Sequence, residues 1–145
     1  MFINKNTILN WIMPIMIAMV VFVFARPTLA QIMTPEELSR YVLENDVTVG
    51  EETVGGFRHI YYLLNEEKIF VTSGTNNSRD PAVNKEYMAW VTEVNGSGGQ
   101  IFLYHIPTGI TTAITGSSTN LNPRVSANGE VVWERWLGDR WQIFM

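Results

Sequence analysis

The residues of this chain that could carry out chemistry are few and lie far apart. There are two histidines, His59 and His105, and no cysteine among the 145 residues. A transition-metal site needs several histidine, cysteine or carboxylate ligands at short spacing, and neither histidine has a second histidine or a cysteine beside it. We therefore expect no metal site and no cofactor, with each histidine packed in the fold or lying on the surface.

The sequence also lacks the usual patterns of hydrolytic catalysis. No serine lies in a Gly-x-Ser-x-Gly segment, so the nucleophile elbow of a hydrolase is absent. Adjacent glutamates occur at 36–37, 51–52 and 66–67. Neighbouring residues on a strand point to opposite faces, so solvation explains these pairs better than joint acid-base chemistry. We expect no catalytic constellation in this chain.

Polar residues beside two prolines are better candidates, and the chemistry that they suggest is binding. The segment "SRDP" contains Arg79 and Asp80, and "NLNPR" contains Asn122 and Arg124. Guanidinium, carboxylate and amide groups can recognise the polar groups of a protein or a glycan. We expect both segments to be loops. The side-chain oxygens of Asn76, Asn77 and Asp80 could also bind calcium, but they lack an ordered 1-3-5 ligand spacing, and an Asn-rich connecting loop is favoured.

Four tryptophans suggest a stacking surface at first sight. Trp90 and Trp133 occupy matching positions of a repeat described below, which favours packing in a core over ligand stacking. Trp136 and Trp141 flank the turn "LGDR". A sugar or peptide could stack on Trp136, but two aromatic residues that grip each other across a hairpin are an equally good interpretation.

Composition limits what can position these residues. With 46% hydrophobic and 17% charged residues, the chain can bury one modest core and no more. Without residues 1–30 the chain keeps 8 basic and 14 acidic side chains, a net charge of −6. The basic residues are scattered singly along the sequence, so nucleic acid is not expected as a partner.

The N-terminus has the pattern of a signal peptide. Lys5 precedes an apolar run over 8–25, which is followed by Arg26-Pro27 and small residues. The pattern predicts a signal peptide over 1–30, with cleavage between Ala30 and Gln31. An uncleaved membrane anchor is the alternative, because the apolar run could nearly span a bilayer. In both cases the remainder is expected to be exported, in the periplasm, outside the cell or on its surface, with the membrane a partner only through an uncleaved segment.

One short helix is expected after the cleavage site. In "TPEELSRYVLEND", Thr34 is a candidate N-cap, Pro35 fits the first helical position and Glu37 completes a capping box. A weak strand, "VTVGEETV", follows. The helix and this lead-in strand make up the predicted segment 31–57.

From residue 58 onward, short β-branched and aromatic runs alternate with Gly, Asn and Pro, which is typical of consecutive antiparallel strands. Several landmarks recur 42 residues apart, among them Pro81 with Pro123 and Gln100-Ile101-Phe102 with Gln142-Ile143-Phe144. Such a period with four strands per unit is typical of propeller blades. We expect one whole unit at 79–115, two strands of the unit before it at 59–73, and three strands of the unit after it at 121–145.

The strand pattern favours stacked sheets. "EYMAW" and "EVVW" are apolar at successive positions, so both faces of those strands should be covered. Neighbouring blades cover both faces, whereas a strand in a two-layer sandwich normally alternates apolar and polar residues. The sandwich is the structural alternative.

These segments resemble the TolB-like β-propeller repeat, also called the WD40-like or PD40 repeat. The matching segments are "DPAVNKEYMAW", "QIFLYHIPTGITTAIT" and "NPRVSANGEVVWERWLGDRWQIFM". Gln100 and Gln142 replace the acidic residue that is usual in that repeat. The resemblance implies an all-β fold: antiparallel four-stranded blades of a truncated β-propeller over 58–145, with the remaining blades missing.

The resemblance implies a noncatalytic binding module whose ligand is a protein or a carbohydrate. Arg79, Asp80, Asn122 and Arg124 would then lie at one rim of the propeller, and Trp136 is a further candidate contact. Two alternatives stay open: the substrate-filtering propeller of a serine peptidase whose catalytic domain is missing, and a structural envelope protein.

Overall fold

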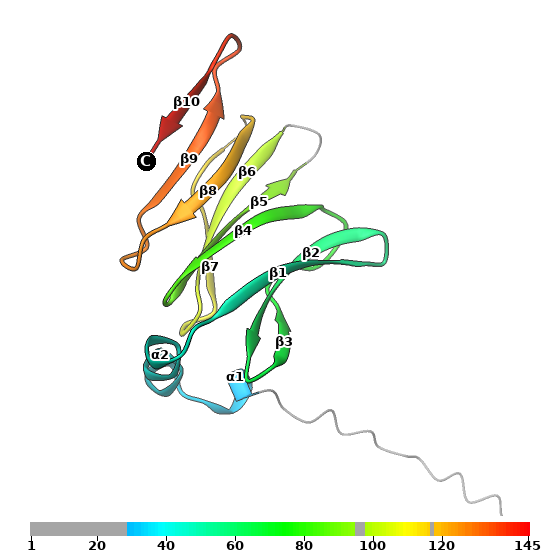
Figure 1. The fold of residues 1–145 in the computed structure, drawn as a ribbon. Helices are drawn as coiled ribbons and strands as arrows, with labels where there is room; N and C mark the ends of the chain where they lie inside the picture. Colours follow the sequence, from blue (N-terminus) through cyan, green and yellow to red (C-terminus); the bar gives the residue numbers. More distant parts are fainter. Residues whose placement is uncertain (1–28, 95–97, 117) are drawn as a thin grey trace, which may run out of the picture.

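The chain folds into short helices followed by antiparallel strands (Figure 1). The computed structural model describes residues 29–94, 98–116 and 118–145. The helices are α1 (Leu29–Ile32) and α2 (Pro35–Glu44). The strands are β1 (Thr48–Val54), β2 (Phe57–Leu64), β3 (Glu67–Phe70), β4 (Ser78–Asn84), β5 (Tyr87–Glu93), β6 (Gly99–His105), β7 (Ile110–Ala113), β8 (Asn120–Val125), β9 (Val131–Trp136) and β10 (Trp141–Phe144).

Helix α2 begins as its sequence predicts. The Thr34 hydroxyl accepts a hydrogen bond from the Glu37 amide, and the Glu37 carboxylate accepts one from the Thr34 amide, which together form a capping box. Leu38 and Val42, one turn apart, are the buried residues of the helix. The Ser39 hydroxyl donates a hydrogen bond to Glu86, which ties the helix to the turn between β4 and β5. The predicted helix is therefore confirmed.

The strands form three antiparallel sheets in chain order. The first sheet has the order β1-β2-β3, the second β4-β5-β6-β7 and the third β10-β9-β8. The four-stranded second sheet and the three-stranded third sheet match the strand counts expected from the repeat. The first sheet has three strands where two were expected, because β1 pairs with β2 along its whole length, from Thr48 opposite Leu63 to Val54 opposite Phe57. The fold is thus predominantly antiparallel β, as the sequence predicts.

The second sheet lies between the other two and is covered on both faces. Met88 and Trp90 of β5 belong to a first cluster, which the first sheet and α2 share with it. Ala89 and Val91, which point the opposite way, belong to a second cluster shared with the third sheet. The prediction that "EYMAW" is buried on both faces is therefore confirmed. The members of the first cluster are Leu38, Val42, Ile60, Tyr62, Leu64, Met88, Trp90 and Ile106, and those of the second are Ala89, Val91, Ile101, Val125, Val131 and Trp133.

The same prediction is wrong for "EVVW" in β9. Val131 and Trp133 are buried against the second sheet, whereas Val132 between them is 37% exposed. The physical reason is that no sheet lies against the other face of the third sheet within the described residues (Figure 1). Apolar residues at successive positions therefore correspond here to one covered face and one uncovered face.

The repeat is visible in the hydrogen bonds as well as in the sequence. The Ile60 amide donates to the Thr72 hydroxyl at 2.8 Å in the first sheet, and the Ile101 amide donates to the Thr115 hydroxyl at 2.9 Å in the second. Two stacked aromatic pairs also correspond: Trp90 with Phe102 at 6.0 Å between ring centroids, and Trp133 with Phe144 at 6.1 Å. Equivalent residues thus make equivalent contacts in successive sheets.

Candidate functional site

The two proline segments chosen from the sequence form matching β-bulges. The pairing of β4 with β5 shifts register between Arg79 and Ala82, and the pairing of β8 with β9 shifts between Leu121 and Arg124. Inside these bulges Asp80 has a φ of 55° and Asn122 a φ of 51°. Aspartate and asparagine tolerate this left-handed conformation better than other non-glycine residues.

The expectation that these segments are loops is wrong. "SRDP" lies within β4 and "NLNPR" within β8. An Asx-Pro pair is a local turn signal, but each strand resumes its ladder after the bulge, so pairing with the neighbouring strand overrides that signal. The candidate side chains are therefore held by a sheet.

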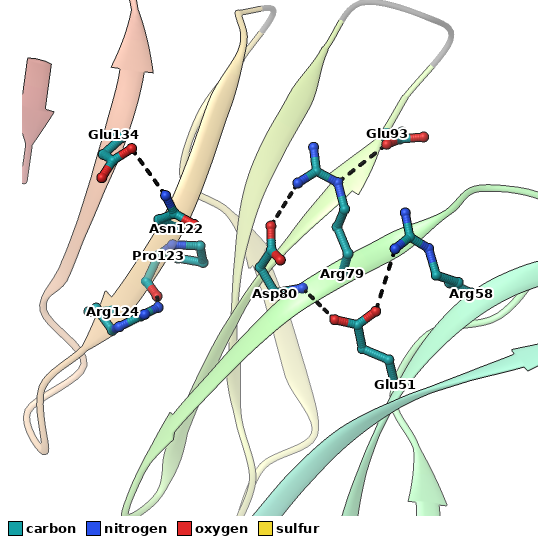
Figure 2. A network of polar contacts seen from close by, with 9 residues as sticks. All are labelled: Glu51, Arg58, Arg79, Asp80, Glu93, Asn122, Pro123, Arg124 and Glu134. Atoms are coloured by element: carbon teal, nitrogen blue, oxygen red, sulfur yellow. Dashed lines mark hydrogen bonds and ion pairs between the residues drawn. The ribbon is translucent and has the colours of Figure 1, made fainter. Parts of the chain in front are cut away.

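Asp80 lies at the centre of a polar network that joins the first and second sheets (Figure 2). Its backbone amide donates to Oε1 of Glu51 in β1 at 2.9 Å, and the other oxygen of Glu51 lies 3.7 Å from Nη1 of Arg58. The Asp80 carboxylate accepts a hydrogen bond of 2.7 Å from Nη1 of Arg79, whose Nε donates to Glu93 at 3.3 Å. Two carboxylates thus fix the guanidinium of Arg79.

Asn122 and Arg124 form a separate group on the third sheet. Nδ2 of Asn122 donates to Oε2 of Glu134 at 3.1 Å, and Nη1 of Arg124 donates to the carbonyl oxygen of Pro123 at 2.7 Å. In Figure 2 no hydrogen bond or ion pair joins this group to the network around Asp80 among the residues drawn. The structure therefore brings Arg79 together with Asp80, and Asn122 together with Arg124, as two distinct places.

An open polar groove lies beside Arg79. It has a volume of about 520 Å³ and is lined by Thr75, Asn76, Asn77, Arg79, Glu93, Gly98, Gly99 and Thr119. Gly99 is required where β6 meets β8, because a Cβ there would lie 2.4 Å from the carbonyl oxygen of Asn120. Part of the Asn77 side chain is already used, since its Oδ1 accepts a hydrogen bond from the Arg58 amide at 3.0 Å. The groove therefore offers amide, hydroxyl, guanidinium and carboxylate groups between the second and third sheets.

Metal chemistry receives no positive support from this arrangement. Within residues 29–94, 98–116 and 118–145 there is no group of three or more His, Asp or Glu side chains placed to hold a metal ion. The Asp80 carboxylate, one of the oxygens considered for calcium, is paired with Arg79. His59 is buried on β2, and Nδ1 of His105 lies 2.9 Å from the Thr108 hydroxyl at the end of the second sheet.

The tryptophans divide as their repeat positions suggest. Trp90 and Trp133 are buried in the first and second clusters, which confirms their predicted core role. Trp136 and Trp141 contact each other across the β9–β10 hairpin, with ring centroids 5.4 Å apart and planes inclined by 52°. Both remain partly exposed, so the hairpin grip is observed and the stacking of a ligand on Trp136 stays a prediction.

The phenols of Tyr62, which is buried, and Tyr104, which is partly buried, both have shifted pKa values. Burial raises the pKa of Tyr62 above its ordinary value, and the neighbouring Tyr104 raises it further. Burial also raises the pKa of Tyr104, whose ring centroid lies 6.4 Å from that of Tyr62. These phenols belong to the packing between the first and second sheets and lie outside the groove.

Sequence reasoning missed the partners that fix the candidate side chains. Glu51, Arg58, Glu93 and Glu134 come from neighbouring strands, and Glu51 lies 29 residues before Asp80. The adjacent glutamates at 51–52 indicated only exposure to solvent, so no local signal pointed to this contact.

No protein-family model matches the chain, and no curated protein matches it. The resemblance to the TolB-like repeat therefore stays a prediction. Of the two helices within residues 29–145 that the structure describes, neither is long and apolar enough to cross a membrane, and the predicted apolar segment over 8–25 lies outside the described residues.

Proposed function

We propose that this chain is part of a TolB-like β-propeller and serves as an exported, noncatalytic binding module. The observation that carries the binding role is the polar groove beside Arg79, at the junction of the second and third sheets. The propeller assignment is supported by three antiparallel sheets in chain order and by contacts that recur from sheet to sheet. Each unit of such an array packs on its neighbours and leaves strand ends available for a ligand.

The chemistry of the groove favours a protein ligand over a glycan. Its lining contains donors and acceptors but no aromatic ring on which a sugar could stack. The guanidinium of Arg79 is held between Asp80 and Glu93, so it is ordered before a ligand arrives. An extended polar segment of a protein can use these groups through its backbone amides and carbonyls. A glycan would instead use the exposed pair Trp136 and Trp141 on the third sheet.

Binding arrays test this proposal with the wild-type chain and three variants. The chain is presented to an array of peptides and an array of glycans, and the strongest binder is titrated. We expect a peptide to bind and Arg79→Ala to weaken it about 10- to 100-fold, because a hydrogen bond to a charged group contributes about 1.5–3 kcal/mol. Arg140→Ala removes an exposed arginine paired with Asp139 and should leave the affinity unchanged.

The third variant, Arg124→Ala, separates the two candidate places. The sequence assigns Arg124 to the same binding surface as Arg79, but the structure puts it in the separate group on the third sheet. An equal loss of affinity for both variants, with unchanged circular dichroism, would move the ligand out of the groove and onto both bulged strands. A hydrolytic activity that purified with the chain and disappeared on changing one of its serines would contradict the binding role.

Export is a separate part of the proposal, and it is supported by the sequence of residues 1–30. Ala30 lies in the short helix α1, and Gln31 follows it. Mass analysis of the protein from an exporting host should give Gln31 as the N-terminus. Intact Met1 in the membrane fraction would replace cleavage with the membrane-anchor alternative.

A further inference from the structure

The third sheet has an uncovered face whose residues repeat those of two covered faces. The ladder pairs Glu51 with Ile60, Val91 with Ile101, and Glu134 with Ile143 fix the correspondence between the three sheets. On a strand, the residue two positions before the first member of each pair points to the same face. With it included, the equivalent sets are Val49, Glu51 and Ile60; Ala89, Val91 and Ile101; and Val132, Glu134 and Ile143. We call the last set the outer face.

In the first two sheets the sheet that follows buries the isoleucine of this face, while Glu51 stays exposed and Val49 half-buried. Ile60 and Ile101 are each 0% exposed. Ile60 lies in the first cluster with Trp90, and Ile101 lies in the second cluster with Trp133. Trp90 and Trp133 are themselves equivalent residues of successive sheets, and each stacks on a phenylalanine. The cover of such a face is therefore a sheet that carries a Trp-Phe pair.

The outer face has the same apolar character without that cover. Ile143 is 71% exposed, against full burial of its two equivalents. Asn122, Arg124, Val132, Trp133, Glu134 and Ile143 line a depression of about 360 Å³ on this sheet. Burying an isoleucine is favourable by about 1.5–3 kcal/mol, so the outer face gains from a cover in the way that the other two do.

Glu134 adds a specific polar contact to this apolar match. Its equivalent in the first sheet, Glu51, accepts the Asp80 amide of the bulge in the next sheet at 2.9 Å. Among the described residues, the only hydrogen bond that Glu134 accepts comes from a side-chain amide of its own sheet, that of Asn122 at 3.1 Å. A carboxylate at this position can therefore receive the backbone amide of a bulge that lies opposite.

We propose that the outer face binds a further antiparallel sheet of the same repeat, with Glu134 accepting the backbone amide of that sheet's Asx-Pro bulge. This inference rests on the propeller part of the proposed function. The occupant carries a Trp-Phe pair that covers Val132 and Ile143. The interface continues the contacts between the first and second sheets and between the second and third.

A second copy of this chain does not offer such a partner. The free face of its first sheet has Gly50 at the position of Trp90, and the Tyr61 ring fills the place where a side chain would be. Among the described residues, no bulged strand pairs with the free edge of β1. The occupant is thus a sheet of the kind that follows in the repeat.

Thiol labelling tests the proposal directly, because the chain has no cysteine of its own. The full chain carrying Ile143→Cys is compared with a fusion of the same variant to a second copy of residues 104–145. The copy follows Met145 directly, because Met145 is the repeat equivalent of Leu103. That copy supplies an outer strand for the third sheet and then one further sheet with its Asn-Pro bulge. We expect the labelling rate of the single thiol to fall at least tenfold in the monomeric fusion.

Matched variants assign the protection to the proposed contacts. Trp133→Ala with Phe144→Ala in the second copy should restore the labelling rate of the unfused chain. Glu134→Ala in the first copy should restore part of it, whereas Asp139→Ala, in the exposed β9–β10 turn, should not. A fusion whose thiol labels as fast as in the unfused chain overturns the proposal, whether the added segment folds elsewhere or not at all. Protection that depends on chain concentration without the fusion would make the occupant a second copy and would also overturn it.

One more thiol separates this proposal from the repeat on which it rests. Ile101→Cys in the unfused chain should label slowly, since its face is covered by the third sheet. Fast labelling there would refute the stacked repeat and the propeller assignment with it. Slow labelling there, with no protection at position 143 in the fusion, would refute the further sheet alone.

Discussion

Equivalent isoleucines of the second and third sheets should differ strongly in what their truncation costs. Ile101 and Ile143 occupy the same position of the repeat. Ile101 pairs with Val91 in the second sheet, and Ile143 pairs with Glu134 in the third. Ile101→Ala removes a fully buried side chain from the second cluster, so the lost burial and the cavity together should cost about 2–5 kcal/mol. Ile143 is 71% exposed, so Ile143→Ala loses about a third of the burial term and leaves no cavity, a cost below about 1 kcal/mol.

Urea denaturation followed by circular dichroism and tryptophan fluorescence measures both variants. Each substitution also replaces a β-branched residue in a strand, and this shared cost cancels when the two are compared. We expect the free energies of unfolding to differ by roughly 1–5 kcal/mol, with little change in the urea dependence. A variant Ile101→Ala that is unfolded without urea would agree with this reasoning if Ile143→Ala remains folded. Equal losses for the two variants would refute the claim that only one of these faces is covered.

Three further predictions follow from the described contacts. Burial raises the pKa of the Tyr62 phenol. The phenol's contribution to stability is therefore complete below the unfolded pKa of about 10 and is lost as the pH rises above it. In alkaline urea titrations, Tyr62→Phe should reduce the slope of the unfolding free energy against pH by about 1.4 kcal/mol per pH unit. Thr115→Val should cost about 1–3 kcal/mol in urea denaturation, because the Ile101 amide loses its acceptor at 2.9 Å, and a loss below about 0.5 kcal/mol would contradict the role of this hydroxyl. Thr34→Ala should cost about 1 kcal/mol by removing the cap of α2, seen as faster amide exchange at Glu37, and unchanged exchange there would contradict it.

Local sequence signals predicted the elements that depend on local chemistry. The capping box of α2 could be predicted because a few residues at fixed spacing determine it, and the core role of Trp90 because Trp133 occupies the matching position of the repeat. The 42-residue period correctly divided the strands of the second and third sheets. A spacing of 42 residues makes Ser73 the repeat equivalent of Thr115, whereas the hydrogen bonds make Thr72 the equivalent, one residue earlier. Short turns absorb such shifts without changing the sheet, so the period alone leaves the register open.

Features that depend on pairing between distant residues could not be predicted. Strand β1 contains a glycine and two glutamates, which weaken its strand pattern, and its pairing with β2 stabilises it. The Asx-Pro pairs at 80–81 and 122–123 carry turn signals, and only the ladders with β5 and β9 turn them into bulges. The candidate site is affected in the same way, since Glu51 and Glu93 reach Asp80 and Arg79 from other strands.

The central claim, that the second sheet is covered on both faces while the third is covered on one, is tested most directly by four single cysteines. Met88→Cys and Ala89→Cys place a thiol on each face of β5, and Val131→Cys and Val132→Cys do the same on β9. We predict slow labelling at positions 88, 89 and 131 and fast labelling at position 132. Labelling at position 88 or 89 that is as fast as at position 132 would show a strand with one open face, as in a two-layer sandwich, and would contradict the account.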